Sequence, residues 1–312
     1  MDGGLQAMLK FETEQKIFQI GKIQIGGQPG QLPTVLIGTI FYERHKIVKD
    51  MEKGIFDKEA AEQLIRTHEE LSERTGVPCM IDVVGVTPTA IPKYLDFVAE
   101  KTEMPILIDS TSAEVKIAGI KHANEVGLAD RVVYNSITHH VTQEELDAIR
   151  ENNIKAAVIL TYNPHNVWPK GRIELLKGNG SKKGLLALAE EAGIEKPLVD
   201  TAVLDVPSIS LAAEAVKLVR NEFGLPAGGA PANAVLEWKR VKEISPDAKK
   251  VCMANAVTAM QYAGANFLLY GPIKNAPTIF PAVAMADAII AYSARLKGVA
   301  PKTKDHPLYK IF

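Results

Sequence analysis

The sequence predicts an α/β protein in which eight parallel strands alternate with helices and close into a single (β/α)8 barrel, or TIM barrel. Apolar, β-branched segments alternate with helical segments, eight such units are present, and five of the apolar segments end in an acid or an amide. A chain of 312 residues with 46% apolar residues is long enough, since such barrels need about 250 residues. We expect one domain over residues 1–312, with residues 1–10 flexible or derived from cloning.

The first half of the chain is predicted to supply a hairpin and four strand–helix units. Residues 15–26 alternate apolar and polar side chains around Gly21-Lys22, which predicts a β-hairpin that closes the bottom of the barrel. Asp57 is placed to cap the first helix, and Thr142 with Glu145 has capping-box spacing before the fourth. Strands are expected at residues 34–40, 79–83, 105–108 and 131–134, and helices at residues 58–74, 91–101, 113–126 and 142–151.

The second half is predicted to continue the alternation with a longer loop inserted. The loop covers residues 163–179, after the fifth strand, and contains Pro164 and Pro169. Gly193 follows the next helix in a position typical of a helix end. Strands are expected at residues 156–160, 197–199, 225–227 and 266–269, and helices at residues 183–192, 208–223, 232–243, 250–264 and 281–297.

Composition excludes several classes of function. A net charge of −1 gives no electrostatic footprint for nucleic acid or an anionic membrane, and the apolar runs are shorter than the roughly 18 residues of a membrane span. Cys79 and Cys252 form neither a disulfide framework nor a zinc pattern, and no His-x-His pair ends a strand, so we expect no bound metal. The first residues do not resemble a secretory signal. We therefore expect a cytoplasmic protein without nucleic-acid partners or membrane insertion.

Polar residues at the ends of predicted strands are the main functional signal. Asp82, Asp109, Asn135, Asn163 and Asp200 each end an apolar segment, and the carboxyl ends of barrel strands meet at the face that carries the active site. A carboxylate accepts two parallel hydrogen bonds from an amino group and a ring N–H, and an amide both donates and accepts. This set, which contains no lysine, suits a neutral heterocycle rich in N–H groups. We predict a pterin.

Helix capping is the alternative explanation for the same residues. Asp109 with Ser110-Thr111-Ser112, and Asn135-Ser136, are placed to cap the helices that follow them. Capping explains a single position well but five strand ends poorly, because loops usually separate a cap from the strand. We therefore include Ser112 with the five strand-end residues in the predicted pterin site. A barrel acting on a sugar phosphate stays open as an alternative, since Gly228-Gly229 follows the seventh strand.

Several segments also resemble a known family. FETEQKIFQIGKIQIGGQPGQLPTVLIGTIFYERHKIVKD (Phe11–Asp50), IDVVG, ILIDSTS and EAGIEKPLVDTAVL are similar to the family typified by the H subunit of tetrahydromethanopterin S-methyltransferase. The resemblance covers about Met8–Phe312. Within the family, the chain looks most like bacterial methylcorrinoid:tetrahydrofolate methyltransferases of glycine betaine demethylation.

The resemblance implies roles for particular residues. The wider superfamily, which includes dihydropteroate synthases, binds pterin through an Asp–Asn–Asp set on strands three, four and six, matched here by Asp109, Asn135 and Asp200. An Asn after strand seven lies near the pterin N5 in these relatives, and its best match is Asn233, so Asn233 and Asp200 are the predicted catalytic residues. The stretch 230–233 is Ala-Pro-Ala-Asn, where the H-subunit pattern has Gly-x-His-Asn before Trp, and this departure favours the folate-using branch.

The implied activity is methyl transfer between the cobalt of a methylcorrinoid and N5 of tetrahydrofolate, which gives 5-methyltetrahydrofolate. Cobalamin is expected on a separate corrinoid protein, because Asp305-His306-Pro307 does not continue as the corrinoid-binding pattern Asp-x-His-x-x-Gly. The resemblance also implies a homodimer. The alternatives are a tetrahydromethanopterin-using subunit of a larger complex and a dihydropteroate synthase-like condensing enzyme, for which Pro226-Ala227-Gly228 lacks the strand-seven lysine.

Overall fold

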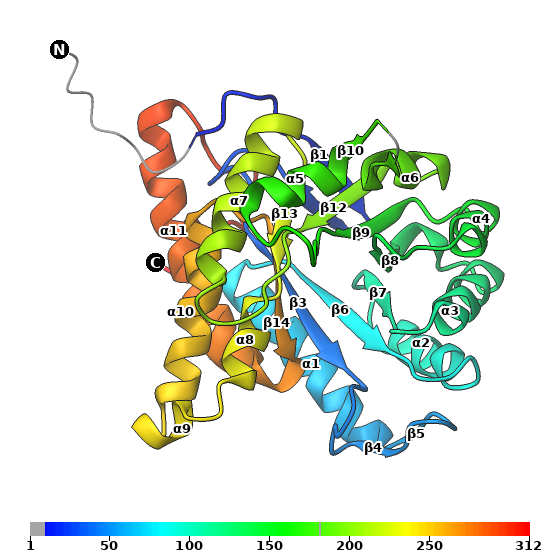
Figure 1. Cartoon of the computed structure of the whole chain (residues 1–312). Coiled ribbons are helices and arrows are strands. Elements are labelled where there is room, and N and C mark those ends of the chain that lie inside the picture. Colours follow the sequence, from blue (N-terminus) through cyan, green and yellow to red (C-terminus); the bar gives the residue numbers. More distant parts are fainter. Residues whose placement is uncertain (1–9, 181) are drawn as a thin grey trace.

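The computed structural model describes residues 10–180 and 182–312. Within these ranges, eight parallel strands close into a barrel in the order β3-β6-β7-β8-β9-β12-β13-β14, surrounded by helices (Figure 1). The predicted fold class is confirmed. Residues 1–9, which carry most of the predicted flexible or cloning-derived segment, lie outside the described residues.

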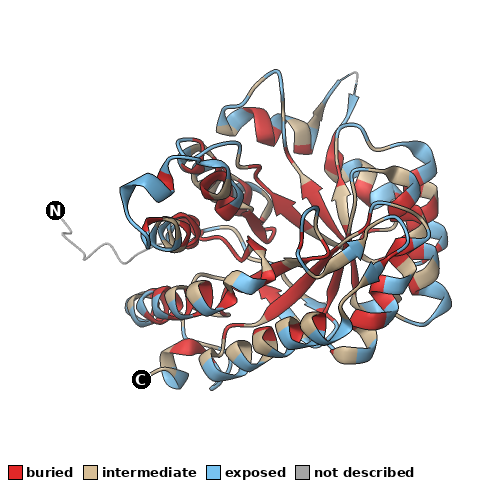
Figure 2. Cartoon of the chain, turned by 90° about the horizontal axis from the view of Figure 1, so that it is seen from below, coloured by how far each residue is buried: buried red, intermediate tan, exposed pale blue. Residues whose placement is uncertain are grey.

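The barrel strands are the most deeply buried part of the chain, and the helices around them bury their inner faces and expose their outer faces (Figure 2). The strands are β3 (Val35–Ile40), β6 (Cys79–Val84), β7 (Ile106–Asp109), β8 (Val132–Ile137), β9 (Ala156–Leu160), β12 (Lys196–Asp200), β13 (Ala227–Gly229) and β14 (Phe267–Pro272). The helices are α1 (Lys58–Thr75), α2 (Ala90–Lys101), α3 (Ala113–Glu125), α4 (Gln143–Glu151), α5 (Pro169–Lys177), α6 (Leu185–Glu191), α7 (Ile209–Phe223), α8 (Pro231–Glu237), α9 (Val241–Ile244), α10 (Ala248–Tyr262), α11 (Ala276–Ala294) and α12 (Pro307–Lys310).

Alternation along the strands builds the interior of the barrel. One apolar cluster fills it, with members that include Ile37, Met80, Leu107, Val133 and Leu198. Because side chains on a strand alternate between faces, the residue two positions later points to the same interior. Those next positions, at the carboxyl ends of the strands, are Thr39, Asp82, Asp109, Asn135 and Asp200.

The predicted N-terminal hairpin is present as β1 (Ile17–Ile20) and β2 (Ile23–Gly26). Ile20 and Ile25 are fully buried in the same cluster that fills the barrel, at the amino ends of the strands. The hairpin therefore closes the bottom of the barrel, as the sequence predicts.

Arg220 of α7 connects the N-terminal segment to the barrel. Its buried guanidinium donates hydrogen bonds to the carbonyl oxygens of Gly27 and Gly264 and, at 2.6 Å, to Oε1 of Gln15. The same group lies 4.4 Å from the centre of the Phe11 ring. Four separate parts of the chain thus meet at one side chain.

Two segments to which no strand or helix was assigned contain secondary structure. The segment after β3 forms an antiparallel pair, β4 (Val48–Asp50) and β5 (Ile55–Phe56), whose strands are too short to show periodicity. The loop predicted over residues 163–179 contains α5, which begins at Pro169. Proline is favourable in a first helical turn, so the residue that suggested a loop marks a helix start. A second short pair, β10 (Gly178–Asn179) and β11 (Lys182–Lys183), follows α5.

Three predicted boundaries are shifted. Strand β13 begins at Ala227, two residues later than expected, and consists mainly of glycine because a Cβ at Gly228 would lie 2.0 Å from the carbonyl oxygen of Phe267. The helix expected over residues 232–243 is divided into α8 and α9. Helix α11 begins at Ala276, five residues before Pro281, so this proline lies inside the helix.

Residues Ile273–Lys297, which contain α11, are long and apolar enough to cross a membrane by length and composition alone. However, 56% of the apolar 18-residue stretch within this range is buried inside the protein, as expected for a core helix. We therefore interpret α11 as part of the barrel wall.

Candidate functional site

The carboxyl ends of five strands form a polar ring at the mouth of the barrel, opposite the hairpin. Asp109 of β7 pairs in register with Asn135 of β8, and Thr39 of β3 pairs with Asp82 of β6. Asp200 ends β12. The structure thus brings together four of the predicted site residues and adds Thr39, which was not predicted.

Asp82 holds the Asn135 amide in place. Nδ2 of Asn135 donates a hydrogen bond to Oδ1 of Asp82 at 3.2 Å, and Oγ1 of Thr39 donates to Oδ2 at 2.9 Å. Asp82 is only 2% exposed, whereas Asn135 is half-buried. Oδ1 of Asn135 has no hydrogen-bond partner within residues 10–180 and 182–312, so it is available as an acceptor.

Asp82 and Asp109 compete for one negative charge. Burial, together with the nearby Asp109 carboxylate, raises the pKa of Asp82 well above its usual range. Burial raises the pKa of Asp109 to about 6, while Lys116 and the Ser110 backbone N–H oppose this shift. Since Asp82 is the more buried of the two, we expect it to hold the proton and Asp109 to carry the charge near neutral pH.

A buried network behind β8 fixes the end of that strand. Nζ of Lys116, on α3, lies 2.9 Å from Oε1 of Glu145 and donates to the carbonyl oxygen of Ser136 at 3.2 Å. The hydroxyl of Tyr134 donates to the same Glu145 oxygen, and Lys116 lies 4.7 Å from the centre of the Tyr134 ring. Both ionised side chains are at most 9% exposed. The network therefore anchors the peptide that follows Asn135.

Asp200 is held by the loop that follows β12. Its Oδ1 accepts a hydrogen bond from the backbone N–H of Ala202 at 2.7 Å, and Oδ2 has no partner in the described part of the chain. Arg172, a buried residue of α5, donates to the carbonyl oxygens of Ala202 at 3.0 Å and Val167 at 2.8 Å. Burial raises the pKa of Asp200 to about 6, opposed by the Ala202 N–H and Arg172. One carboxylate oxygen of Asp200 is thus left without a hydrogen bond in the described part of the chain.

The other predicted residues differ in their surroundings. Asn233 lies in the first turn of α8, is exposed, and stands beside Gly271, where an added Cβ would lie 3.3 Å from Oδ1 of Asn233. Ser112 is the half-buried N-cap residue of α3, without a side-chain capping bond. Asn163 lies beyond the ring: Nδ2 donates to the Gly171 carbonyl at 3.1 Å, and Oδ1 accepts from two backbone N–H groups. Its polar atoms stabilise the loop before α5.

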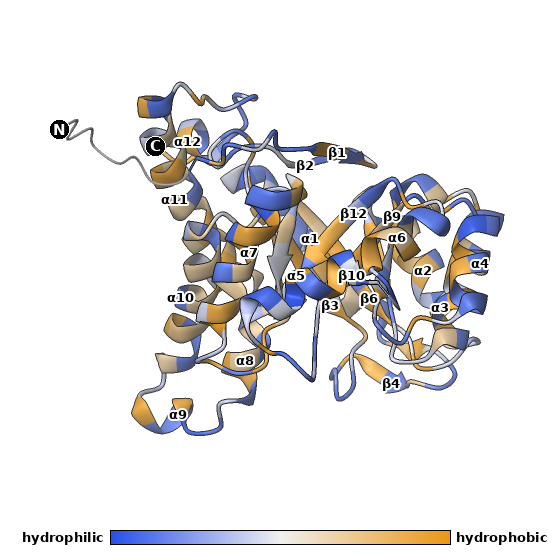
Figure 3. Cartoon of the chain, turned by 45° about the horizontal axis from the view of Figure 1, so that its top comes forward, coloured by the Kyte–Doolittle hydropathy of each residue, from blue (hydrophilic) through white to orange (hydrophobic). Residues whose placement is uncertain are grey.

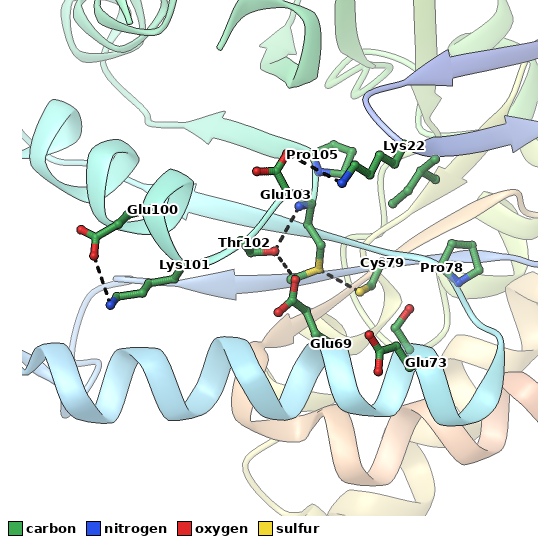
Figure 4. A pocket seen from close by; sticks show the side chains of 13 residues that line it. Lys22, Glu69, Glu73, Pro78, Cys79, Glu100, Lys101, Thr102, Glu103 and Pro105 are labelled. Carbon is green, nitrogen blue, oxygen red and sulfur yellow. Dashed lines mark hydrogen bonds and ion pairs between the residues drawn. The ribbon is translucent and has the colours of Figure 1, made fainter. Parts of the chain in front are cut away.

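A hollow of about 620 Å³ lies at the opposite end of the barrel, between α1, α2 and the hairpin (Figure 4). Lys22 of the hairpin turn lies 4.0 Å from Glu103 there, and Sγ of Cys79 lies 3.0 Å from Sδ of Met104. This is the amino-terminal end of the strands, whereas barrel enzymes carry their chemistry at the carboxyl end. The polar ring at the mouth is therefore the candidate active site. Within the described ranges, no group of three or more His, Cys, Asp or Glu side chains is placed to hold a metal ion.

Comparison with known proteins places the chain near one family. The family model described as "Tetrahydromethanopterin S-methyltransferase MtrH subunit" matches residues 13–302. The chain is 46% identical to the H subunit of tetrahydromethanopterin S-methyltransferase from Methanopyrus kandleri, over 94% of this chain and 96% of that protein. It is 43% identical to the corresponding subunit from Methanothermobacter thermautotrophicus, over 97% of this chain and 100% of that protein.

Among solved structures, dihydropteroate synthase from Xanthomonas albilineans in complex with 7,8-dihydropteroate is similar in fold. The match has a TM-score of 0.58 and 16% sequence identity, and it covers 88% of this chain and 98% of that chain. At this level of identity, the comparison shows a shared barrel architecture.

Proposed function

The chain belongs to the family of the tetrahydromethanopterin S-methyltransferase MtrH subunit, and on that basis we propose that its barrel mouth binds a reduced pterin and transfers a methyl group between N5 of that pterin and a corrinoid on a partner protein. The observation that carries the proposal is the ring of Asp109, Asn135 and Asp200 at the carboxyl ends of three strands, in which Oδ1 of Asn135 and Oδ2 of Asp200 have no hydrogen-bond partner in the described part of the chain. A pterin presents an amino group and ring N–H groups that match these acceptors.

The residues of the ring orient the pterin. Asp200, through Oδ2, and Asp109 accept from N–H groups of the ring, and Oδ1 of Asn135 accepts from a third donor. Asn233, on the rim beside Gly271, is the residue that we propose to act at N5, because a neutral amide stabilises either charge state of N5. Orientation of this kind supplies a large part of the rate, because both reactants are already aligned. The corrinoid, when the partner carries it, supplies the cobalt that exchanges the methyl group.

The partial corrinoid motif at Asp305-His306-Pro307 does not form a corrinoid site in the described part of the chain. His306, the histidine of the partial motif, is fully buried, and its Nδ1 accepts a hydrogen bond from the Leu308 N–H at 3.1 Å as the cap of α12. It is therefore committed to the fold. This supports the assignment of the corrinoid to a partner protein.

The relatives favour tetrahydromethanopterin over tetrahydrofolate. The relatives from Methanopyrus kandleri and Methanothermobacter thermautotrophicus are named as subunits of a tetrahydromethanopterin S-methyltransferase, so we propose that this chain uses that pterin as one subunit of a larger complex. Tetrahydrofolate is the second candidate, because the stretch 230–233 preceding Trp238 departs from the H-subunit pattern. The link to glycine betaine stays a prediction. A dihydropteroate synthase-like reaction is disfavoured because β13 carries no lysine.

Methyl transfer by the purified chain tests the proposal. Methylcobalamin would be mixed with tetrahydromethanopterin or with tetrahydrofolate, and demethylation of the corrinoid would be followed by its absorbance. We expect turnover with at least one pterin and faster turnover with tetrahydromethanopterin. Faster turnover with tetrahydrofolate would select the second candidate. Absence of both turnover and pterin binding would refute the function.

The pterin affinity is expected to fall as pH decreases through about 6. Asp109 and Asp200 have pKa values raised to about 6, so below that pH both become protonated and lose acceptor capacity, at a cost of up to about tenfold in affinity per pH unit and per group. Calorimetric titration between pH 5 and 8 measures this, and Asp109→Asn should show a shallower dependence. A flat profile in the wild type would contradict the assignment.

We also propose that two copies of the chain pair through α10 and α11. Helix α10 has no charged residue from Val251 to Tyr262, and Asp287, the charged residue of α11, is buried. Figure 3 shows both helices largely in pale and orange colours. The large apolar side chains on these two helices and just after α11 are 38–71% exposed. They are Val251, Tyr262, Met285, Ile289, Tyr292 and Leu296.

A charge placed on this apolar surface should separate the copies. We expect light scattering to give the mass of a dimer for the wild type and of a monomer for Ile289→Lys, because an unpaired ammonium cannot be buried in the interface. Val126→Lys, at a 48% exposed site beyond α3, is the matched control and should stay dimeric. A monomeric wild type, or a dimeric Ile289→Lys, would exclude this surface.

The cytoplasmic location stays a prediction.

A further inference from the structure

Three lysines near the mouth have no ion-pair partner within the described part of the chain. They are Lys242 on α9, Lys249 in the first turn of α10, and Lys274, two residues after the end of β14. Lys249 is half-buried, and the other two are exposed. The neighbouring Lys250 differs, because it lies 3.8 Å from Asp247. We call Lys242, Lys249 and Lys274 the lysine cluster.

The charges of Lys242 and Lys274 act on the ammonium group of Lys249. Burial lowers the pKa of Lys249, and the positive charges of Lys242 and Lys274 lower it further, with Glu237 opposing them. Lys274 also contributes, after burial, to lowering the pKa of His45 to about 4. Like charges crowded around a partly buried ammonium destabilise a protein unless an anion compensates them. Such arrangements are typical of ligand sites.

The lysine cluster stands next to the proposed pterin site. Figure 1 shows α8 beside β14, at the end of the barrel toward which the strands point, and α9 beyond α8. Gly271, in β14, contacts the side chain of Asn233, and Lys274 follows three residues later. The segments after the seventh and eighth strands are where barrels commonly bind anionic groups. A ligand that leaves the polar ring past Asn233 would pass Gly271, three residues before Lys274 of the lysine cluster.

We propose that the lysine cluster binds the anionic tail of the pterin substrate, an inference that rests on the proposed function. The polar ring recognises the ring system, and the three ammonium groups neutralise the negative charges at the far end of the same molecule. The tail of a folate carries glutamyl carboxylates, and that of tetrahydromethanopterin carries a phosphate and carboxylates. The chemistry common to both is an extended polyanion.

Separate probes for the two ends of the ligand test this inference. The full ligands are tetrahydrofolate triglutamate and tetrahydromethanopterin, 6-methyltetrahydropterin represents the head, and p-aminobenzoyl-triglutamate represents the tail. Lys249→Gln is expected to weaken binding of the full ligands about three- to tenfold and to leave the head-only affinity unchanged. Removal of all three ammonium groups should weaken the full ligands on the order of 30-fold. Lys250→Gln, next in sequence but paired with Asp247, is the matched control and should have no effect.

The outcomes separate this inference from the proposed function. Equal effects of Lys249→Gln and Lys250→Gln, or an equal loss for the head-only probe, would overturn the role of the lysine cluster while the polar ring stands. If the wild type binds neither the full ligands nor the head but binds the tail probe through Lys249, the pterin proposal fails and the anion site stands. A loss confined to methyl transfer with a corrinoid protein, at unchanged pterin affinity, would assign these lysines to partner docking and overturn the inference. Thermal unfolding of each variant monitors the fold. The affinity losses for tetrahydromethanopterin and for tetrahydrofolate triglutamate are then compared, and the ligand with the larger loss carries the preferred anionic tail.

Discussion

Asp200→Asn is expected to lower kcat/KM for methyl transfer about 10- to 100-fold, because a charge-assisted hydrogen bond contributes about 1.5–3 kcal/mol. The structure gives the reason. Oδ1 of Asp200 is committed to the Ala202 N–H at 2.7 Å, so Oδ2 is the oxygen left for the substrate. In the variant, an amide NH₂ faces either the Ala202 N–H or the N–H groups of the pterin. Steady-state kinetics and calorimetric pterin titration measure the loss.

The matched control for this variant is Asp130→Asn. Asp130 is exposed and lies at the hairpin end of the barrel, where its backbone carbonyl accepts from the Gly21 N–H. It should retain wild-type kinetics. A change of less than twofold in Asp200→Asn would remove Asp200 from the site. Thermal unfolding of both variants distinguishes a lost contact from a lost fold.

Arg220→Met is expected to lower the free energy of unfolding by about 3–5 kcal/mol, because several buried acceptors lose their donor at once. These acceptors are the carbonyl oxygens of Gly27 and Gly264 and Oε1 of Gln15, and the stacking contact with Phe11 is lost as well. Equilibrium unfolding in urea at constant pH measures the change.

Arg66→Met provides the comparison for Arg220→Met. Arg66 is exposed on α1, where its Nε lies 3.7 Å from Glu70, and loss of such a surface pair costs at most about 1 kcal/mol. Similar unfolding midpoints for the two variants would show that the contacts of Arg220 contribute little. Proteolysis near the hairpin should increase in Arg220→Met alone.

Most of the fold could be predicted because buried parallel strands leave a strong signal. Their β-branched runs are bounded by helices with recognisable caps, such as Asp57, which accepts from the Ala60 N–H, and Thr142, which forms the expected capping box. The same signal located Asp109, Asn135 and Asp200, since each continues the interior alternation of its strand.

The supporting residues of the site could not be predicted, because they act across long sequence separations. Lys116 resembles any helix lysine until Glu145 and the Ser136 carbonyl are brought to it by the fold. Arg172 lies in a segment with proline and glycine that was predicted as a loop. Thr39 offers a weak signal, as a polar residue two positions after Ile37 in an apolar strand.

Asn163 shows the limit of a local pattern. Its segment, ILTYN, resembles those that end in Asp109 and Asp200, but β9 ends at Leu160, and this leucine occupies the last position of the strand. Asn163 lies three residues beyond and orders the following loop through the Gly171 carbonyl and two backbone N–H groups. The position of a polar residue in the interior alternation of its strand, and not the composition of the segment, decides whether it joins the ring.

Because Ile20 and Ile25 close one end of the barrel, a ligand of the polar ring must enter and leave through the mouth at the other end. For the proposed reaction we therefore expect an ordered mechanism. The pterin binds first, the corrinoid protein then docks over the mouth, and the pterin leaves only after the corrinoid protein has dissociated. Saturating amounts of the larger reactant should consequently trap the smaller one and slow its exchange.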